Sequence, residues 1–228
     1  MRFLFVGDSM TIGRAGDFTW RYRMWRHLER VLPGGYGIVG PRTELYEAAD
    51  DAATSHAYAD PGFPADARRH LAGWGEGWLH MAPLAGEAVR ETGADVLLVS
   101  LGLIDLGFYT NSDQTAENVH AFLASVRAAN PHVRTVLLPV IPNVRATYDA
   151  PFAAECHRFN ELLAKAVAEL DTAASPLLLA TVPESYDLRA DTYDGTHPGP
   201  TGEHKLAAAF ANALHQAWGI GGPYTYPS

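Results

Sequence analysis

The sequence has little cysteine, little lysine and no long hydrophobic run. Its single cysteine, Cys156, cannot form an intramolecular disulfide, so the composition gives no sign of an oxidising compartment. Lysine occurs only at Lys165 and Lys205, and the arginines form no basic run. The apolar stretch at residues 1–6 is too short for a signal peptide or a membrane span. These absences predict a cytoplasmic protein with no membrane association.

The charge balance excludes a further class of partner. The chain of 228 residues carries a formal net charge of -9. A nucleic-acid-binding protein usually shows a basic patch, and none is visible here. A hydrophobic fraction of 47% and a charged fraction of 19% are ordinary for a globular protein. At this length we expect a single domain spanning residues 1–228.

Apolar runs alternate with amphipathic helical patterns along the chain. This alternation is typical of an α/β fold with a mostly parallel sheet. Between residues 47 and 77 the chain is irregular and rich in glycine and proline, and long loops of this kind often carry function. The expected strands are residues 3–6, 36–39, 95–101, 135–141 and 177–182. The expected helices are residues 19–32, 78–91, 116–129, 152–170 and 201–218.

A serine follows the first expected strand, within Gly7-Asp8-Ser9-Met10-Thr11. In an open α/β sheet, binding sites form where loops leave the carboxyl ends of the strands. At such a turn, the hydroxyl of Ser9 can face a cleft while backbone N–H groups point at a developing negative charge. The same residues could also serve only as a helix cap, because aspartate and serine are common in that position.

A second motif, Asp194-Gly195-Thr196-His197-Pro198-Gly199, precedes the last expected helix. A hydroxyl needs a base to become a good nucleophile, and histidine is the usual base near neutral pH. A carboxylate three residues before His197 could fix its tautomer and stabilise the imidazolium. Aspartate, glycine and proline are also ordinary turn residues, so this motif alone is a weak signal.

Together the two motifs resemble the SGNH or GDSL-type serine hydrolases. In that family a GDS motif ends the first strand and a DxxHP motif precedes the last helix. The resemblance extends in the right order over nearly the whole chain. Residues 70–74 resemble the glycine-tryptophan block of carbohydrate-esterase-like members, and residues 98–106 (LVSLGLIDL) resemble the block usually written LGTNDL. Further matching segments are Tyr22-Arg23 with Leu28, Val39-Gly40, Phe159-Asn160 and residues 202–207.

The resemblance implies a three-layer α/β/α, flavodoxin-like fold with about five parallel strands. It also implies that Ser9 is the nucleophile, that His197 is the general base and later the acid, and that Asp194 orients His197. The backbone N–H groups of Ser9 and Gly73 would be oxyanion donors, with Gly75 as the alternative to Gly73. The family site needs no cofactor. The candidate substrate-binding residues are Asp8, Met10, Trp74 and Ile104.

One position departs from the family pattern. The family usually has an asparagine two residues after the glycine of the third block, and its amide is a third oxyanion donor. Here Gly102 and Asp105 match, but the position between them is Ile104, which cannot donate a hydrogen bond. Losing such a donor costs roughly 2.7–4 kcal/mol in other serine hydrolases. Nearby residues that could replace the donor, or be plain loop residues, are Tyr109, Asn111 and Asn143.

Other polar and aromatic residues have simpler interpretations. The spacing of several histidines and aspartates matches no known ligand pattern, so we expect no metal site. These residues are His56, His70, His80, Asp50, Asp51 and Asp60. Trp20 and Trp25 are expected in the core, whereas Trp74 and Trp78 could line the cleft or pack inside. Cys156 lies on the apolar face of a helix and is expected to be inert.

The sequence therefore predicts a serine esterase or acyl hydrolase that works through an acyl-enzyme. Its substrate would be a small ester, such as an acetylated sugar or secondary metabolite. Two alternatives stay open. An acyltransferase or cyclising enzyme would use the same triad with another acceptor, and an apolar oxyanion region around Ile104 is compatible with that. A catalytically decayed binding protein is the other alternative, and the intact triad residues count against it.

Overall fold

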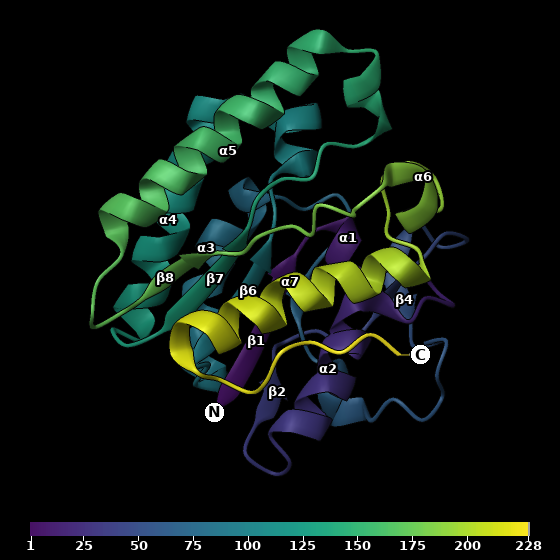
Figure 1. Cartoon of the computed structure of the whole chain (residues 1–228), viewed down its shortest axis with the longest axis vertical. Helices are drawn as coiled ribbons and strands as arrows, with labels where there is room; N and C mark the ends of the chain where they lie inside the picture. Colours follow the sequence, from purple (N-terminus) through teal and green to yellow (C-terminus); the bar gives the residue numbers. More distant parts are fainter. Residues whose placement is uncertain (228) are drawn as a thin grey trace.

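The computed structural model describes residues 1–227 as a parallel sheet between two layers of helices (Figure 1). The strand order is β2-β1-β6-β7-β8, and a short sixth strand, β5, also pairs with β1. All pairs in this sheet are parallel. This arrangement confirms the expected α/β fold. The strands are β1 (Arg2–Gly7), β2 (Gly37–Val39), β5 (Leu71–Ala72), β6 (Val96–Ser100), β7 (Arg134–Leu138) and β8 (Leu177–Leu179).

Five long helices cover the sheet. On one face α2 (Thr19–Val31) packs against α7 (Pro200–Trp218), which crosses the front of the sheet in Figure 1. On the other face α3 (Trp78–Thr92) packs against α4 (Ser112–Ala129), and α4 packs against α5 (Ala150–Leu170). Since both faces are covered, the central strands are uninterrupted apolar runs with no exposed side. Among residues 1–227, no helix combines the length and apolar character needed to cross a membrane.

The five expected helices and five expected strands are all present, with shifted ends. The largest shift is in α4, which begins at Ser112 because Asn111 caps it by accepting the Gln114 N–H at 2.9 Å. Strands β7 and β8 end earlier than expected, at Leu138 and Leu179.

Several short elements had no counterpart in the sequence analysis. The irregular segment contains a hairpin of β3 (Leu45–Glu47) and β4 (Ala52–Ser55), a 3-10 turn η1 (Ala65–Arg68) and β5. Four more single turns lie in loops. They are α1 (Ser9–Ile12), the π-type turn η2 (Asp105–Tyr109), the 3-10 turn η3 (Val144–Thr147) and α6 (Leu188–Asp191). Elements of this length contain too few residues to show a hydrophobic period.

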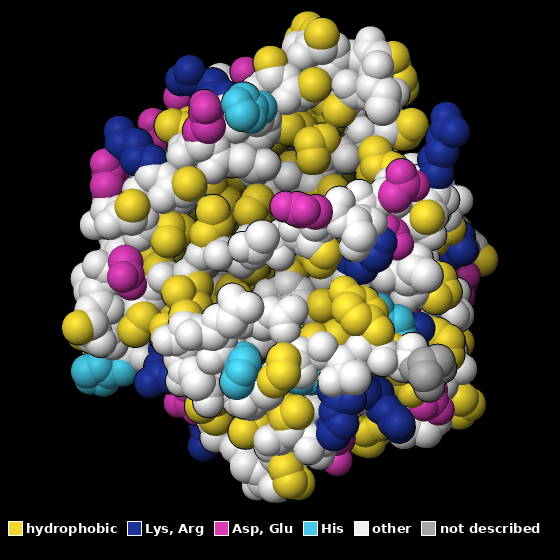
Figure 2. Space-filling model, in the orientation of Figure 1, with side chains coloured by type: hydrophobic (Ala, Val, Ile, Leu, Met, Phe, Trp, Pro, Cys, Tyr) yellow, Lys and Arg dark blue, Asp and Glu magenta, His cyan; other side chains and the backbone are white. Residues whose placement is uncertain are grey.

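The edge strand β8 is the least covered part of the sheet. Figure 2 shows apolar side chains gathered in the hollow between α5 and α7, where β8 runs. Leu178 and Leu179 are partly buried there and line a shallow cavity together with Ala209, Ala213 and Tyr226 of the α7 side. The polar motifs of the sequence analysis lie at a different place, beyond the carboxyl ends of the strands.

Candidate active site

Ser9 begins α1 directly after β1, at the carboxyl end of the central strand. The turn is tight: a Cβ on Gly7 would lie 2.0 Å from Thr11 Oγ1 and 2.7 Å from the Ser100 carbonyl oxygen, so only glycine fits. Asp8 caps α1, because its Oδ1 accepts the Met10 N–H at 3.0 Å. The capping role considered for Asp8 is therefore present, and it leaves the hydroxyl of Ser9 free to face outward.

His197 links Ser9 and Asp194, which are 185 positions apart in the chain. Its Nε2 lies 2.9 Å from Ser9 Oγ, and its Nδ1 lies 2.7 Å from Asp194 Oδ2. The other carboxylate oxygen, Asp194 Oδ1, accepts the N–H groups of Thr196 at 2.9 Å and of His197 at 2.8 Å. With Nδ1–H donated to Asp194, Nε2 is the ring nitrogen that is able to accept the serine proton.

The two carboxyl groups nearest Ser9 have opposite pKa shifts. Burial alone would raise the pKa of Asp194, but hydrogen bonds from His197 and the Thr196 N–H outweigh it, and the pKa lies below its usual value. Asp194 is therefore an anion at neutral pH. Asp8 is buried, and this desolvation, with a smaller contribution from nearby Asp105, raises its pKa to about 7. Near neutrality Asp8 is partly protonated.

Aromatic rings enclose the imidazole of His197. Trp74 stacks on it with ring centroids 4.7 Å apart and Tyr193 stacks on it at 5.6 Å, both within 18° of parallel. Tyr46 continues the stack beyond Trp74 at 4.2 Å, and the Arg14 guanidinium lies 3.8 Å from the centre of the Tyr193 ring. The stack fixes the plane of the ring, and aromatic faces favour an imidazolium if one forms. The sequence analysis missed Tyr193, although it adjoins the Asp194 motif.

A cavity of about 290 Å³ opens beside Ser9 and His197. Three of the four candidate substrate-binding residues line it, namely Asp8, Trp74 and Ile104. Met10 does not: its side chain is buried and borders a separate small hollow under the loop after β7. Residues that line the cavity and were not proposed from the sequence are Leu103, Gly107, Phe108, Arg145, Phe152 and Thr196.

The two glycines considered as oxyanion donors, Gly73 and Gly75, differ in the hydrogen bonding of their backbone N–H groups. The N–H of Gly73 donates to the Gly7 carbonyl at 3.2 Å and continues the pairing of β5 with β1. It is therefore engaged within the sheet. Gly75 lines the cavity instead, in a left-handed conformation with φ of +74°. Within residues 1–227, the N–H groups of Ser9 and Gly75 have no hydrogen-bond acceptor.

The three residues considered as replacements for the family asparagine occupy different places. Asn111 is used as the cap of α4, and the Tyr109 hydroxyl donates to the Gly75 carbonyl at 3.1 Å. Asn143 lines the cavity together with Ile104. Its Oδ1 accepts the Arg145 N–H at 3.1 Å, which orients the amide, while its Nδ2 has no acceptor in the described part of the chain. Asn143 is thus the candidate with a free donor at the cavity.

Several residues that were considered for a chemical role stabilise the fold instead. Asp105 caps α3 by accepting the N–H groups of Trp78 at 2.9 Å and Leu79 at 3.2 Å. The ring of Trp78 is buried against Phe122 and does not line the cavity. The buried His70 ring contacts the Glu44 carbonyl through Nε2 at 3.0 Å. No cluster of side chains able to hold a metal ion occurs among residues 1–227.

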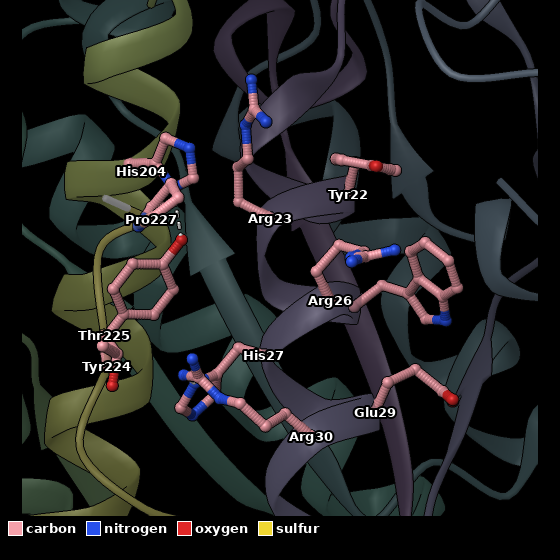
Figure 3. A pocket seen from close by; sticks show the side chains of 11 residues that line it. Tyr22, Arg23, Arg26, His27, Glu29, Arg30, His204, Tyr224, Thr225 and Pro227 are labelled. Carbon is pink, nitrogen blue, oxygen red and sulfur yellow. Dashed lines mark hydrogen bonds between the residues drawn. The ribbon is translucent and has the colours of Figure 1, made fainter. Parts of the chain in front are cut away.

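A larger cavity, of about 670 Å³, lies away from the triad, between α2 and the C-terminal segment (Figure 3). Arg23, Arg26 and Arg30 line it from successive turns of α2, and His204 and Tyr224 line it from the opposite side. The Arg23 guanidinium is paired with Glu203 at 2.8 Å. None of the nucleophile, base or acid candidates borders this groove, so the cavity beside Ser9 is the candidate active site.

Comparisons with known proteins agree with this geometry. The chain resembles the carbohydrate esterase family 3 protein of Talaromyces cellulolyticus, with a TM-score of 0.76 and 23% identity over 95% of this chain and 97% of that one. The family 3 carbohydrate esterase of Clostridium thermocellum gives 0.71 and 18%, over 94% of both chains. An acetyl-xylooligosaccharide esterase from Geobacillus gives 0.66 and 16%, over 95% of both chains.

These identities are low, so the three structures support the fold and say nothing of the substrate. A search of curated protein sequences found no match. A family model, in contrast, matches residues 5–205, which include all three residues of the Ser9–His197–Asp194 arrangement. The chain is a hydrolase that belongs to the GDSL-like lipase/acylhydrolase family.

Proposed function

We propose that this protein is a serine esterase that hydrolyses small esters through a covalent acyl-enzyme formed on Ser9. The observation that supports it best is the unbroken series of contacts from Ser9 Oγ through His197 to Asp194, at 2.9 and 2.7 Å. A nucleophile, a base and an orienting anion within hydrogen-bond reach are the arrangement that acyl transfer requires.

The reaction follows from these contacts. Ser9 Oγ attacks the ester carbonyl carbon while His197 Nε2 takes the hydroxyl proton, and Asp194 stabilises the resulting imidazolium. The tetrahedral intermediate collapses, the C–O bond to the alcohol breaks, and His197 returns the proton to the departing oxygen. Water then loses a proton to His197 as it attacks the acyl-enzyme. The second collapse releases the acid and restores the Ser9 hydroxyl.

The intermediate carries a negative oxygen that needs hydrogen-bond donors. We propose the N–H groups of Ser9 and Gly75, with Gly75 in place of Gly73. The third donor is the Asn143 amide, because it is the side-chain amide that borders the same cavity as Ile104. Donors held in place before the reaction stabilise the transition state without reorganisation.

The size of the cavity favours a small substrate. About 290 Å³ holds a short acyl group and part of an alcohol, and an acetyl-xylooligosaccharide esterase is among the proteins of similar fold. The walls formed by Leu103, Ile104 and Phe108 are apolar, which favours acyl transfer to another nucleophile as the second candidate function. A single domain and a cytoplasmic location remain part of the proposal, the latter on the evidence of one free cysteine.

A serine-directed fluorophosphonate tests the nucleophile. We expect the reagent to label the native protein once, and peptide mapping to place the adduct on Ser9. Ser9→Ala should abolish both labelling and hydrolysis of p-nitrophenyl acetate. Ser185→Ala, which changes an exposed serine away from the cavity, is the matched control and should behave like the native protein. Full hydrolytic activity in Ser9→Ala would refute the proposal.

A further inference from the structure

Among residues 1–227, Arg145 is the only arginine or lysine that lines the cavity beside Ser9. Three contacts fix its guanidinium in place. Nε donates to Asp149 Oδ2 at 2.7 Å, and Nη1 donates to the Gly107 carbonyl at 3.1 Å. The guanidinium also lies over the Phe152 ring, with Cζ 4.5 Å from its centre. An arginine held this firmly loses little conformational freedom when it binds a ligand.

The remaining nitrogen of this group is free. Within residues 1–227, Nη2 has no acceptor, so it offers two N–H groups. A side-chain donor bordering a largely apolar cavity needs an oxygen from solvent or from the substrate to satisfy it. Arg145 lies on η3, two residues after Asn143, so this donor is on the same short segment as the proposed oxyanion amide.

The local charge balance indicates which kind of oxygen would bind. Asp149 does not simply neutralise Arg145, because its other oxygen, Oδ1, accepts the Phe152 N–H at 3.1 Å and caps the N-terminus of α5. The helix end carries a partial positive charge, so the carboxylate is shared between two positive groups. The formal charges of this pair sum to zero, and the partial positive charge of the helix end adds to them. A carboxylate forms a charge-assisted hydrogen bond with the guanidinium that is stronger than one from a neutral oxygen.

We propose that the ester substrate carries a carboxylate, which Arg145 binds through Nη2 while Ser9 attacks the ester group. This inference rests on the esterase function proposed above and names the class of its substrate: an ester with a free carboxylate in its acyl or its alcohol part. Arg145 determines specificity and takes no part in bond making or breaking.

Matched ester pairs test the proposal. The first pair is 4-nitrophenyl hemisuccinate and its methyl ester, and the second is 4-acetoxybenzoate and its methyl ester. Within each pair the two esters differ in the charge of one group. We expect kcat/KM to favour the anion in at least one pair, and Arg145→Gln to reduce that preference about ten- to a hundredfold. Arg145→Lys, which keeps the charge without the planar fork, should retain part of the preference.

Two further variants separate recognition from a general disturbance. Asp149→Asn keeps a good helix cap but removes the negative partner of Arg145, so the preference for the anion should increase. Arg158→Gln removes an exposed arginine of α5 that pairs with Asp113 outside the cavity, and it should leave the preference unchanged.

The outcomes are distinct. If the wild type shows no preference for the anion in either pair, or if Arg145→Gln impairs the charged and neutral esters equally, the carboxylate proposal is overturned. Binding of a neutral oxygen would produce the second pattern. Either result leaves the esterase intact, since the neutral esters still report turnover. Absence of all ester hydrolysis and of Ser9 labelling would instead contradict the proposed function.

Discussion

The two walls of the cavity are built in different ways. The wall that carries His197 is fixed by hydrogen bonds at both ring nitrogens and by the stacked rings of Trp74 and Tyr193. The opposite wall comes from the single turns η2 and η3 and projects into solvent. Phe108 in η2 is 77% exposed, and Tyr148 just after η3 is 77% exposed.

This contrast between the walls suits two different tasks, namely the chemical reaction on one wall and the selection of the substrate on the other. A group that transfers a proton must keep its geometry within tenths of an ångström, so rigid packing around His197 fits the proton transfer proposed for it. Residues on short surface turns can change without disturbing the sheet, so the other wall is where a substrate can be selected. The predictions below test whether changes on the first wall abolish the reaction while changes on the second adjust it.

The largest effect is expected at the rigid wall. His197→Ala removes the base, and kcat for a simple ester should fall about a thousandfold or more. Without an acceptor for its proton, Ser9 is a poor nucleophile at neutral pH. Steady-state kinetics with p-nitrophenyl acetate measures the loss. Asp194→Asn should also lower kcat strongly and leave the thermal unfolding midpoint nearly unchanged, because its carboxylate is partly exposed.

His204→Ala is a control for the loss of a histidine, since His204 lies in the groove beside α2 and not at Ser9. It should keep native kcat. Near-native turnover in His197→Ala would mean that the hydrogen-bonded series at Ser9 is not the catalytic machinery, and the comparison of the two walls would lose its basis.

The same contrast explains what could be predicted from the sequence. The rigid wall is made from contiguous motifs: the strand that ends at Ser9 and the short turn that carries Asp194 and His197. Local sequence encodes such turns through glycine, aspartate and proline, so both motifs could be identified. The family resemblance and the α/β fold were confirmed, because long buried strands and amphipathic helices leave clear periodic patterns.

The more exposed wall could not be predicted in this way. Leu103, Arg145 and Phe152 line one cavity because the loop after β6, the turn η3 and the first turn of α5 converge, and no local pattern encodes that convergence. The sequence favours Gly73 over Gly75 as an oxyanion donor. The hydrogen bond that engages the Gly73 N–H beyond the end of β5 is not visible in the sequence. Met10 was expected at the substrate, but the turn of α1 directs its side chain into the interior.

A smaller effect is expected on the more exposed wall, at Ile104 and Asn143, which begin η2 and η3. If Asn143 supplies the third oxyanion donor, Asn143→Ala should lower kcat/KM for simple esters about ten- to a hundredfold, part of what such a donor contributes elsewhere. Ile104→Asn in the native protein should then give little gain. In the Asn143→Ala background, Ile104→Asn should recover part of the loss.

The alternative has the opposite signature. If the site works with only two donors, Asn143→Ala should have almost no effect, and Ile104→Asn alone should raise kcat/KM on simple esters about ten- to a hundredfold. Asn111→Ala, which removes only the cap of α4, controls for a general loss of stability. These four variants, compared with the native protein, decide whether the more exposed wall contributes a donor to the reaction.

The smallest effect concerns stability at the rigid wall, and it depends on pH. Burial raises the pKa of Asp8 to about 7, whereas in the unfolded chain this carboxyl ionises near its ordinary value of 3.8. Between those values the folded protein holds a proton that the unfolded chain releases. Asp8 therefore lowers the free energy of unfolding as the pH rises from about 4 to about 7, and the cost remains above pH 7.

Asp8→Asn removes this pH-dependent cost, since an amide stays neutral and its oxygen can still accept the Met10 N–H that caps α1. The difference in unfolding midpoint between variant and native protein should be small at pH 4.5 and should increase to several degrees in favour of the variant at pH 8, as measured by calorimetry. Asp113→Asn, at an exposed carboxylate paired with Arg158, should give a difference that does not change with pH. If the difference in unfolding midpoint between Asp8→Asn and the native protein does not change with pH, the Asp8 carboxyl is ionised in the folded protein over this range. An increase would show that the turn carrying Ser9 keeps a carboxyl that lowers stability, as expected where a site is arranged for chemistry at the expense of the fold.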